Sequence, residues 1–130
     1  YQHAIGQISA TSLISLTQYL ALHRNDYHLL AAHHHPLPCE GRMDKHEWTN
    51  RHEFNAVVAK NASVKGEVYR QIHTAIEQQD SGCLYMACPS TCWQYATKPS
   101  FATSDLTPGD RVIELQENGR IITSSHRLKT

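Results

Sequence analysis

Residues 27–38 read YHLLAAHHHPLP, and this stretch decides how the chain is interpreted. Tyr27 to His33 is a short apolar run, typical of a buried strand. It ends in a row of three histidines followed by Pro36 and Pro38, which forbid regular structure. Ligands bind where strands of an open sheet end, and a loop stiffened by prolines presents a ligand at a lower entropy cost. The histidines are therefore candidate ligands.

The segments around this strand predict a domain of mixed type. Helical spacing of apolar residues predicts helices over 7–23, with a cap at Ser9, Thr11 or Ser12, and over 48–61. Strands are expected at 64–69, 74–79 and 83–88, and Asn118-Gly119 predicts a hairpin between 111–116 and 121–126. Residues 39–47 are expected to form a polar loop, and 90–108 a long irregular one. We expect one α+β domain over 1–130, with a mixed β-sheet and about two helices.

Composition narrows the class of protein. The 130 residues include 12 Lys and Arg and 12 Asp and Glu, so the net charge of zero argues against nucleic acid and against a polybasic membrane surface. Ten residues are histidine, the commonest metal ligand. The four cysteines do not form paired C-x-x-C units, which argues against a zinc ribbon. No signal peptide and no apolar run of about 20 residues is visible, so we expect reduced thiols and a cytoplasmic protein.

Several segments, in order, match one family. AAHHHPLP (31–38), MDKHEWTNRHEF (43–54), CPSTCWQY (88–95) and FATSDLTPGDRVIELQENGRIITSSHRL (101–128) are the segments concerned. Together they resemble the C-terminal half of bacterial class III cyclic AMP phosphodiesterases, which belong to the calcineurin-like metallophosphoesterase superfamily. The resemblance covers nearly the whole chain. It implies half of a four-layer sandwich in which two mixed sheets lie between helices.

The resemblance also implies what the metal site should contain. The intact family holds two divalent metals of the iron, manganese or zinc type, with ligands from five sequence blocks. The first three, Asp-x-His, Gly-Asp and Gly-Asn-His, are absent from this sequence. The fourth block implies His34 as a ligand. The fifth, Gly-His-x-His in the family, is here Arg70-Gln71-Ile72-His73, so that only His73 matches a ligand.

Ligand number then sets the expectation about activity. His34 and His73 serve different metals in the family, so each ion would keep at most one ligand from this chain. A catalytic zinc ion needs about three protein ligands. We therefore expect no bound cofactor and no hydrolysis from the isolated chain. Arg70 also brings a positive charge to a place where two cations should lie.

The substrate site is less defined by the sequence. Asp44, His46 and Thr91 are candidates for substrate binding, although the first two are equally compatible with a solvated pair and Thr91 with a simple turn after Pro89. Aromatic residues of the long loop, at 93, 95 and 101, either stack on a base or form the private core of that loop.

Three functions stay open from sequence. The chain is a truncated relative that no longer catalyses, or an enzyme whose other half is supplied by another chain or lies upstream of Tyr1, or a histidine-rich metal-binding module that uses His33, His34, His35 and Cys39. Half of a two-sheet sandwich would leave apolar surface and strand edges bare, which predicts a homodimer.

Overall fold

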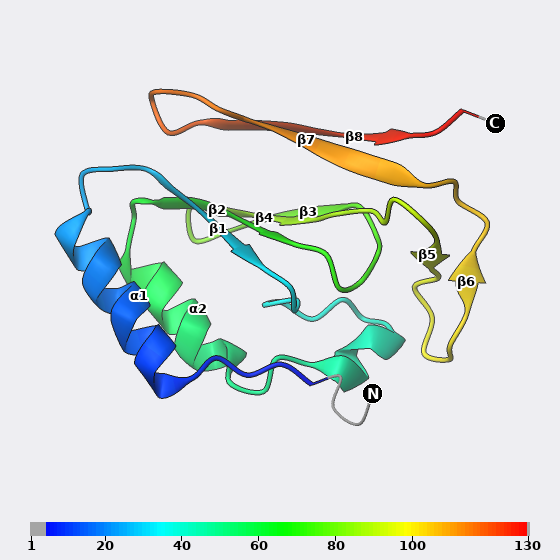
Figure 1. The fold of residues 1–130 in the computed structure, drawn as a ribbon, viewed down its shortest axis with the longest axis horizontal. Helices are drawn as coiled ribbons and strands as arrows, with labels where there is room; N and C mark the ends of the chain where they lie inside the picture. The colour runs from blue at the N-terminus through cyan, green and yellow to red at the C-terminus, as the bar shows by residue number, and fades with distance from the viewer. Residues whose placement is uncertain (1–4, 130) are drawn as a thin grey trace.

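A four-stranded sheet lies at the centre of the molecule, between two helices and a long hairpin (Figure 1). The computed structural model describes residues 5–129. The elements are α1 (Ala10–Leu22), β1 (His28–Ala32), the 3₁₀ helix η1 (Arg42–His46), α2 (Arg51–Lys60), β2 (Val64–Tyr69), β3 (Ile76–Asp80), β4 (Cys83–Ala87), β5 (Gln94–Tyr95), β6 (Thr103–Ser104), β7 (Gly109–Leu115) and β8 (Ile121–Arg127). The order of helices and strands confirms the predicted α+β fold.

The central sheet is mixed, as predicted. Its strand order is β1-β2-β4-β3, with β1, β2 and β4 parallel and β3 antiparallel to β4. Parallel neighbours need a crossover connection, and α2 provides it between β1 and β2. A tight turn at Ser81 and Gly82, both with positive φ, joins β3 to β4. The carboxyl ends of three parallel strands therefore meet at one edge.

The helices cover one face of this sheet and form the main core. Leu20 of α1 and Phe54 and Val58 of α2 are buried in the same cluster as Tyr69 and Tyr85 of the sheet. The helix α1 begins after Ser9, whose Oγ accepts a hydrogen bond from the backbone N–H of Ser12 at 3.0 Å. Ser9 is thus the cap among the predicted candidates.

The hairpin β7–β8 covers the opposite face, and its turn lies at the predicted Asn-Gly pair. A Cβ added at Gly66 would lie 2.5 Å from the Cδ1 of Ile121, so the hairpin approaches the sheet closely where β2 lacks a side chain. Arg111 donates to the carbonyl of Ala87 at 3.1 Å and pairs with Glu77 at 2.8 Å. Both faces of the sheet are therefore covered.

Two predicted loops contain regular structure. The polar loop 39–47 includes η1, because Arg42 N–H donates to the Lys98 carbonyl and Asp44 N–H to the Gly41 carbonyl. The long segment 90–108 folds back on itself as the short ladder β5–β6. The prediction of irregular structure was wrong at these two places. In both segments, the hydrogen bonds that stabilise the element either join residues far apart along the chain or close a single turn.

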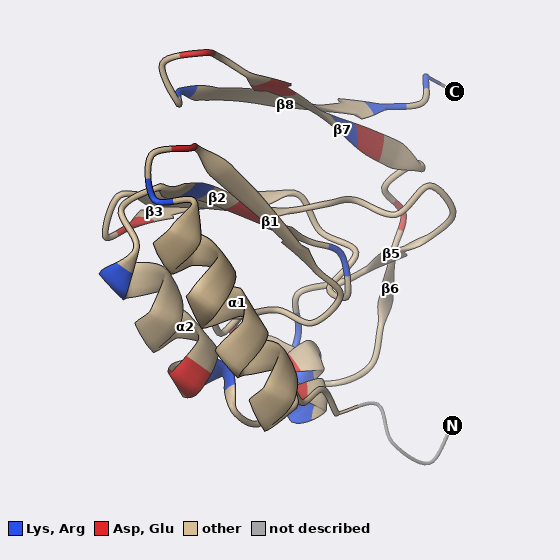
Figure 2. Cartoon of the chain, turned by 60° about the vertical axis from the view of Figure 1, so that its left-hand side comes forward, with Lys and Arg blue, Asp and Glu red and all other residues tan. Residues whose placement is uncertain are grey.

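The described residues contain no helix long and apolar enough to cross a membrane. Basic and acidic residues are interspersed over the elements rather than gathered by sign (Figure 2).

Candidate functional site

A crevice of about 320 Å³ opens at the carboxyl ends of β1, β2 and β4. Its lining includes Ala32 at the end of β1, Arg70 after β2, and Pro89 and Thr91 after β4, together with His73. The parallel strands place these loops at one edge, where ligands bind in open sheets. The crevice lies at the end of the strand for which the sequence predicted a ligand site, but none of the three consecutive histidines lines it.

His73 contributes one ring nitrogen to this crevice. Its Nδ1 lies 3.1 Å from the Trp93 carbonyl oxygen, which is an acceptor only, so Nδ1 carries the proton and Nε2 keeps its lone pair. Its backbone has φ of +52°, which is unusual for a residue other than glycine. Burial lowers the pKa of His73, with a smaller contribution from Arg70, while the hydrogen bond to Trp93 acts in the opposite direction. His73 is therefore held as a neutral imidazole.

Gln71 points away from the crevice. The side chain is buried, with its Oε1 2.9 Å from His35 Nδ1 and its Nε2 donating to the His46 carbonyl at 3.1 Å. Its backbone N–H also donates to the His33 carbonyl. The residue at the first histidine position of the fifth block therefore ties two loops together and does not line the crevice. Sequence reasoning identified Gln71 only as a mismatch in the fifth ligand block and missed this structural role.

The three consecutive histidines lie in different environments. His33 is exposed, and its ring meets that of His34 edge-on at a centroid distance of 4.9 Å. Burial lowers the pKa of His33, followed by the nearby His34, Arg70 and His73. The lowered pKa favours the neutral form of His33 beside the Arg70 guanidinium. His35, in contrast, is completely buried.

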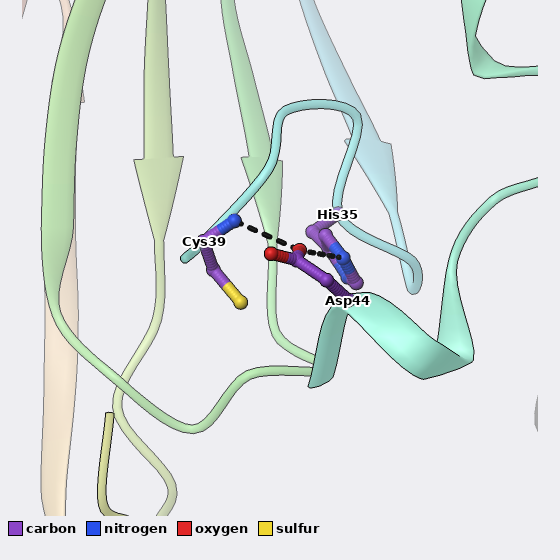
Figure 3. A group of neighbouring side chains, drawn as sticks. All are labelled: His35, Cys39 and Asp44. Carbon is purple, nitrogen blue, oxygen red and sulfur yellow. Dashed lines mark hydrogen bonds and ion pairs between the residues drawn. The ribbon is translucent and has the colours of Figure 1, made fainter. Parts of the chain in front are cut away.

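His35 belongs to a compact cluster with Cys39 and Asp44 (Figure 3). Its Nε2 lies 3.0 Å from Asp44 Oδ1, which also accepts the backbone N–H of Cys39 at 2.9 Å. Burial pushes the pKa of Asp44 upward, but the hydrogen bonds from Cys39 and the contact with His35 outweigh it, and the net shift is downward. Burial raises the pKa of the Cys39 thiol to about 11. Asp44 is thus an ionised carboxylate beside a protonated thiol.

The ligand atoms of His35, Cys39 and Asp44 lie within 4.8 Å of one another. Among residues 5–129, they are the one set of three or more such side chains placed closely enough to share a metal ion. The predicted metal ligands His34 and His73 are not part of it. The structure thus groups His35 and Cys39 of the predicted metal-binding module with Asp44, and not with His33 and His34.

One of the three predicted substrate residues lies at the crevice. Thr91 lines the crevice, whereas Asp44 and His46 do not. The loop that carries Thr91 is braced by Gln94, a fully buried side chain that donates to the Ser90 carbonyl at 2.7 Å and accepts from the Ser90 N–H at 3.0 Å. Sequence reasoning missed Gln94, because nothing in the local pattern distinguishes a buried glutamine from an exposed one.

The aromatic residues of the long loop pack on one another beside the crevice. Trp93 and Tyr95 have ring centroids 4.5 Å apart, and both meet the ring of His73. The ring centroids of Phe101 and Tyr95 lie 6.0 Å apart. The guanidinium of Arg42 lies over the Phe101 ring, 4.8 Å from its centroid. Trp93 and Phe101 remain 42% and 58% exposed, so this private core is open on one side.

Comparison with known proteins gives this arrangement its class. No protein-family profile matches the sequence. A crystal structure of a dimetal phosphatase from Danio rerio is similar over 82% of this chain and 34% of its own, with a TM-score of 0.56 and 19% identity. At that identity the likeness shows the fold alone, an α+β arrangement shared with part of that phosphatase.

Sequence relatives make the assignment more particular. The chain is 36% identical over 128 residues to a cyclic AMP phosphodiesterase of Haemophilus influenzae and 36% over 125 residues to that of Escherichia coli K12, covering 95% of itself and 46% of each relative. A cyclic-nucleotide phosphodiesterase of Nostoc is 31% identical over 125 residues. The chain therefore corresponds to the C-terminal part of the bacterial cyclic AMP phosphodiesterases and spans about half of their length.

Proposed function

We propose that this chain is a truncated relative of a metal-dependent 3',5'-cyclic-nucleotide phosphodiesterase and that it does not hydrolyse phosphodiesters on its own. The direction of the Gln71 side chain carries the proposal. Its oxygen and nitrogen are both engaged with His35 and His46. A crevice that lacks this side chain has lost one of the metal-ligand positions that the resemblance implies.

The remaining donors do not fit a two-metal centre. His73 presents a single nitrogen, and the resemblance assigns His34 to the other ion. Two-metal hydrolysis needs both ions fixed on either side of the phosphate, and each ion needs about three protein ligands. Arg70 lines the same crevice and places a fixed positive charge where cations would have to bind.

A completed enzyme is the second candidate, and one observation favours it. The Trp93 carbonyl fixes the tautomer of His73 with Nε2 unprotonated, which is the form that binds a metal. In this reading the N-terminal part, from the same gene or from another chain, supplies the other ligands. Cyclic AMP would then be cleaved at the crevice, with Thr91 and the aromatic residues at 93 and 95 beside the substrate.

Hydrolysis of cyclic AMP and of a generic phosphodiester, with added Mn²⁺, separates the two candidates. We expect no turnover above background from the chain alone. Turnover that His34→Ala abolishes would overturn the proposal, since a contaminating enzyme would not respond to that variant. Adding the N-terminal part of a relative to the same assay tests the completed enzyme: turnover that requires both parts supports it, and none counts against it.

We further propose that a second copy of the chain covers the outer face of the β7–β8 hairpin. The alternation of the strands puts Val112 and Ile122 on this face, and they are 54% and 42% exposed. Within the described part of the chain, β7 and β8 pair only with each other, so each leaves one edge bare. Exposed apolar side chains beside open strand edges favour self-association.

Light scattering tests the dimer directly. We expect the mass of two chains at high concentration and the mass of one chain for Val112→Glu, because a charge at the centre of the interface is costly to bury. The control is Glu114→Gln, a change on the same face that adds no charge. A clean monomer at high concentration for the unaltered chain would refute the dimer.

A further inference from the structure

The orientation of Gln71 fixes the protonation of His35. The Nε2 of Gln71 donates to the carbonyl of His46, and the reversed amide would set two carbonyl oxygens against each other at that position. The Oε1 of Gln71 must therefore accept from His35, so Nδ1 of His35 carries a proton. Hydrogen bonding of this kind orients a histidine whose other nitrogen binds a metal.

The other nitrogen of His35 then faces a negative charge. Nε2 lies 3.0 Å from Asp44 Oδ1, and that oxygen already accepts the backbone N–H of Cys39. An unprotonated Nε2 and a carboxylate oxygen would direct lone pairs at each other. Something positive must lie between them, and chemistry offers two choices: a second proton on the imidazole or a metal ion.

The third donor favours a metal of a particular kind. Cys39 brings its sulfur within 4.8 Å of both other ligand atoms. Metal binding displaces the proton of the Cys39 thiol. The resulting thiolate, the carboxylate and a neutral imidazole together carry two negative charges, which balance a divalent cation. Sulfur and nitrogen donors select zinc and similar transition metals over magnesium or calcium.

The spacing of the donors is close to what such an ion requires. Zinc lies about 2.0–2.3 Å from oxygen, nitrogen and sulfur ligands, which in a tetrahedron puts neighbouring ligand atoms about 3.3–3.6 Å apart. His35 and Asp44 are near this separation already, and the sulfur lies within 4.8 Å of both. The thiol belongs to a half-buried residue beside Glu40, whose φ of +58° turns the chain back toward Asp44. Asp44 is one-third exposed, so an ion reaches the site from solvent.

We propose that His35, Cys39 and Asp44 form a binding site for one zinc-type ion, with water as the fourth ligand. The site is separate from the crevice, since none of the three residues lines that cavity. It joins the loop after β1 to η1 and so has a structural rather than a catalytic role. The proposal does not depend on whether the chain hydrolyses phosphodiesters.

The test is metal binding by the purified chain, with Zn²⁺ for stoichiometry and Co²⁺ as a spectroscopic probe. Equilibrium dialysis at micromolar Zn²⁺ should give about one ion per chain. The cobalt form should show a thiolate-to-metal charge-transfer band. Cys39→Ser should remove that band and weaken Zn²⁺ binding at least about 100-fold, because a hydroxyl is a poor substitute for a thiolate. Cys92→Ser, a change at an exposed cysteine, should alter neither.

Several results would overturn the proposal. They are less than about one bound ion, a cobalt spectrum without the thiolate band, or equal binding by Cys39→Ser and the unaltered chain. Loss of the ion in a His34→Ala, His73→Ala double variant would assign it to the metal positions that the resemblance implies instead. Thermal unfolding of the metal-free variants checks their folding, and the cobalt spectrum of the unaltered chain decides the matter even if Cys39→Ser does not fold.

Discussion

His35 and Glu67 are both polar, both fully buried and differently supported. Each nitrogen of His35 has an oxygen partner, in Gln71 and in Asp44. Glu67 lies in β2, opposite Leu30 of β1 and Tyr85 of β4, and neither of its carboxylate oxygens has a hydrogen-bond partner in the structure. Both side chains lose their hydration on folding, but only His35 gains hydrogen bonds in exchange.

The difference shows what a buried polar group contributes to stability. A buried group without a partner costs the free energy of its lost hydration, whereas a paired group recovers most of that cost. Burial raises the pKa of Glu67 to about 8, so near neutral pH it is held mainly as an uncharged acid. The His35 cluster ties two loops together, while Glu67 weakens the sheet that positions them.

Replacing Glu67 should have the largest effect. The raised pKa means that the native state holds its proton more tightly than the unfolded chain does, so stability is fully present below pH 4.5 and declines as pH rises toward 8. A shift from 4.5 to about 8 corresponds to a loss of roughly 5 kcal/mol above pH 8. Glu67→Leu should recover about that amount at pH 8.5 and much less at pH 4.5.

Urea unfolding at both pH values measures this effect. Glu117→Gln, which changes an exposed glutamate in the hairpin turn, should keep the pH dependence of the unaltered chain. Equal pH dependence in Glu67→Leu and in the unaltered chain would mean that Glu67 finds a partner or water in solution.

The fold was largely predictable because its signals are local. The strand 64–69 was placed with its observed ends, and the hairpin turn at Asn118-Gly119 was found from the pair itself. Local alternation nevertheless misleads within β2. Lys65 and Glu67 alternate with less polar residues and suggest a solvent-facing row. Glu67 is nevertheless fully buried, opposite Tyr85 of the core, whereas a register shift beside Lys65 places that residue near the hairpin, and no pattern within β2 reveals either.

The candidate site was predicted only in part for a related reason. The end of the strand before the three histidines predicted a ligand site, and the resemblance implied His73 and Thr91, which both line the crevice. The partnership of His35 with Gln71 joins residues 36 positions apart, and its direction depends on a third residue, His46. Sequence spacing carries no information about which of three adjacent histidines turns inward.

That adjacency gives the second test of the comparison, with a smaller expected effect. His35→Ala removes the partner of both Gln71 and Asp44 and leaves a cavity, so we expect a loss of about 3 kcal/mol of unfolding free energy. His34→Ala, one residue earlier on a partly exposed ring, should cost less than about 1 kcal/mol. Urea unfolding in the presence of a chelator measures both without a contribution from bound metal. Similar losses from the two variants would mean that the buried, paired ring of His35 contributes no more to stability than the partly exposed ring of His34. The contrast with Glu67 would then lose its physical basis.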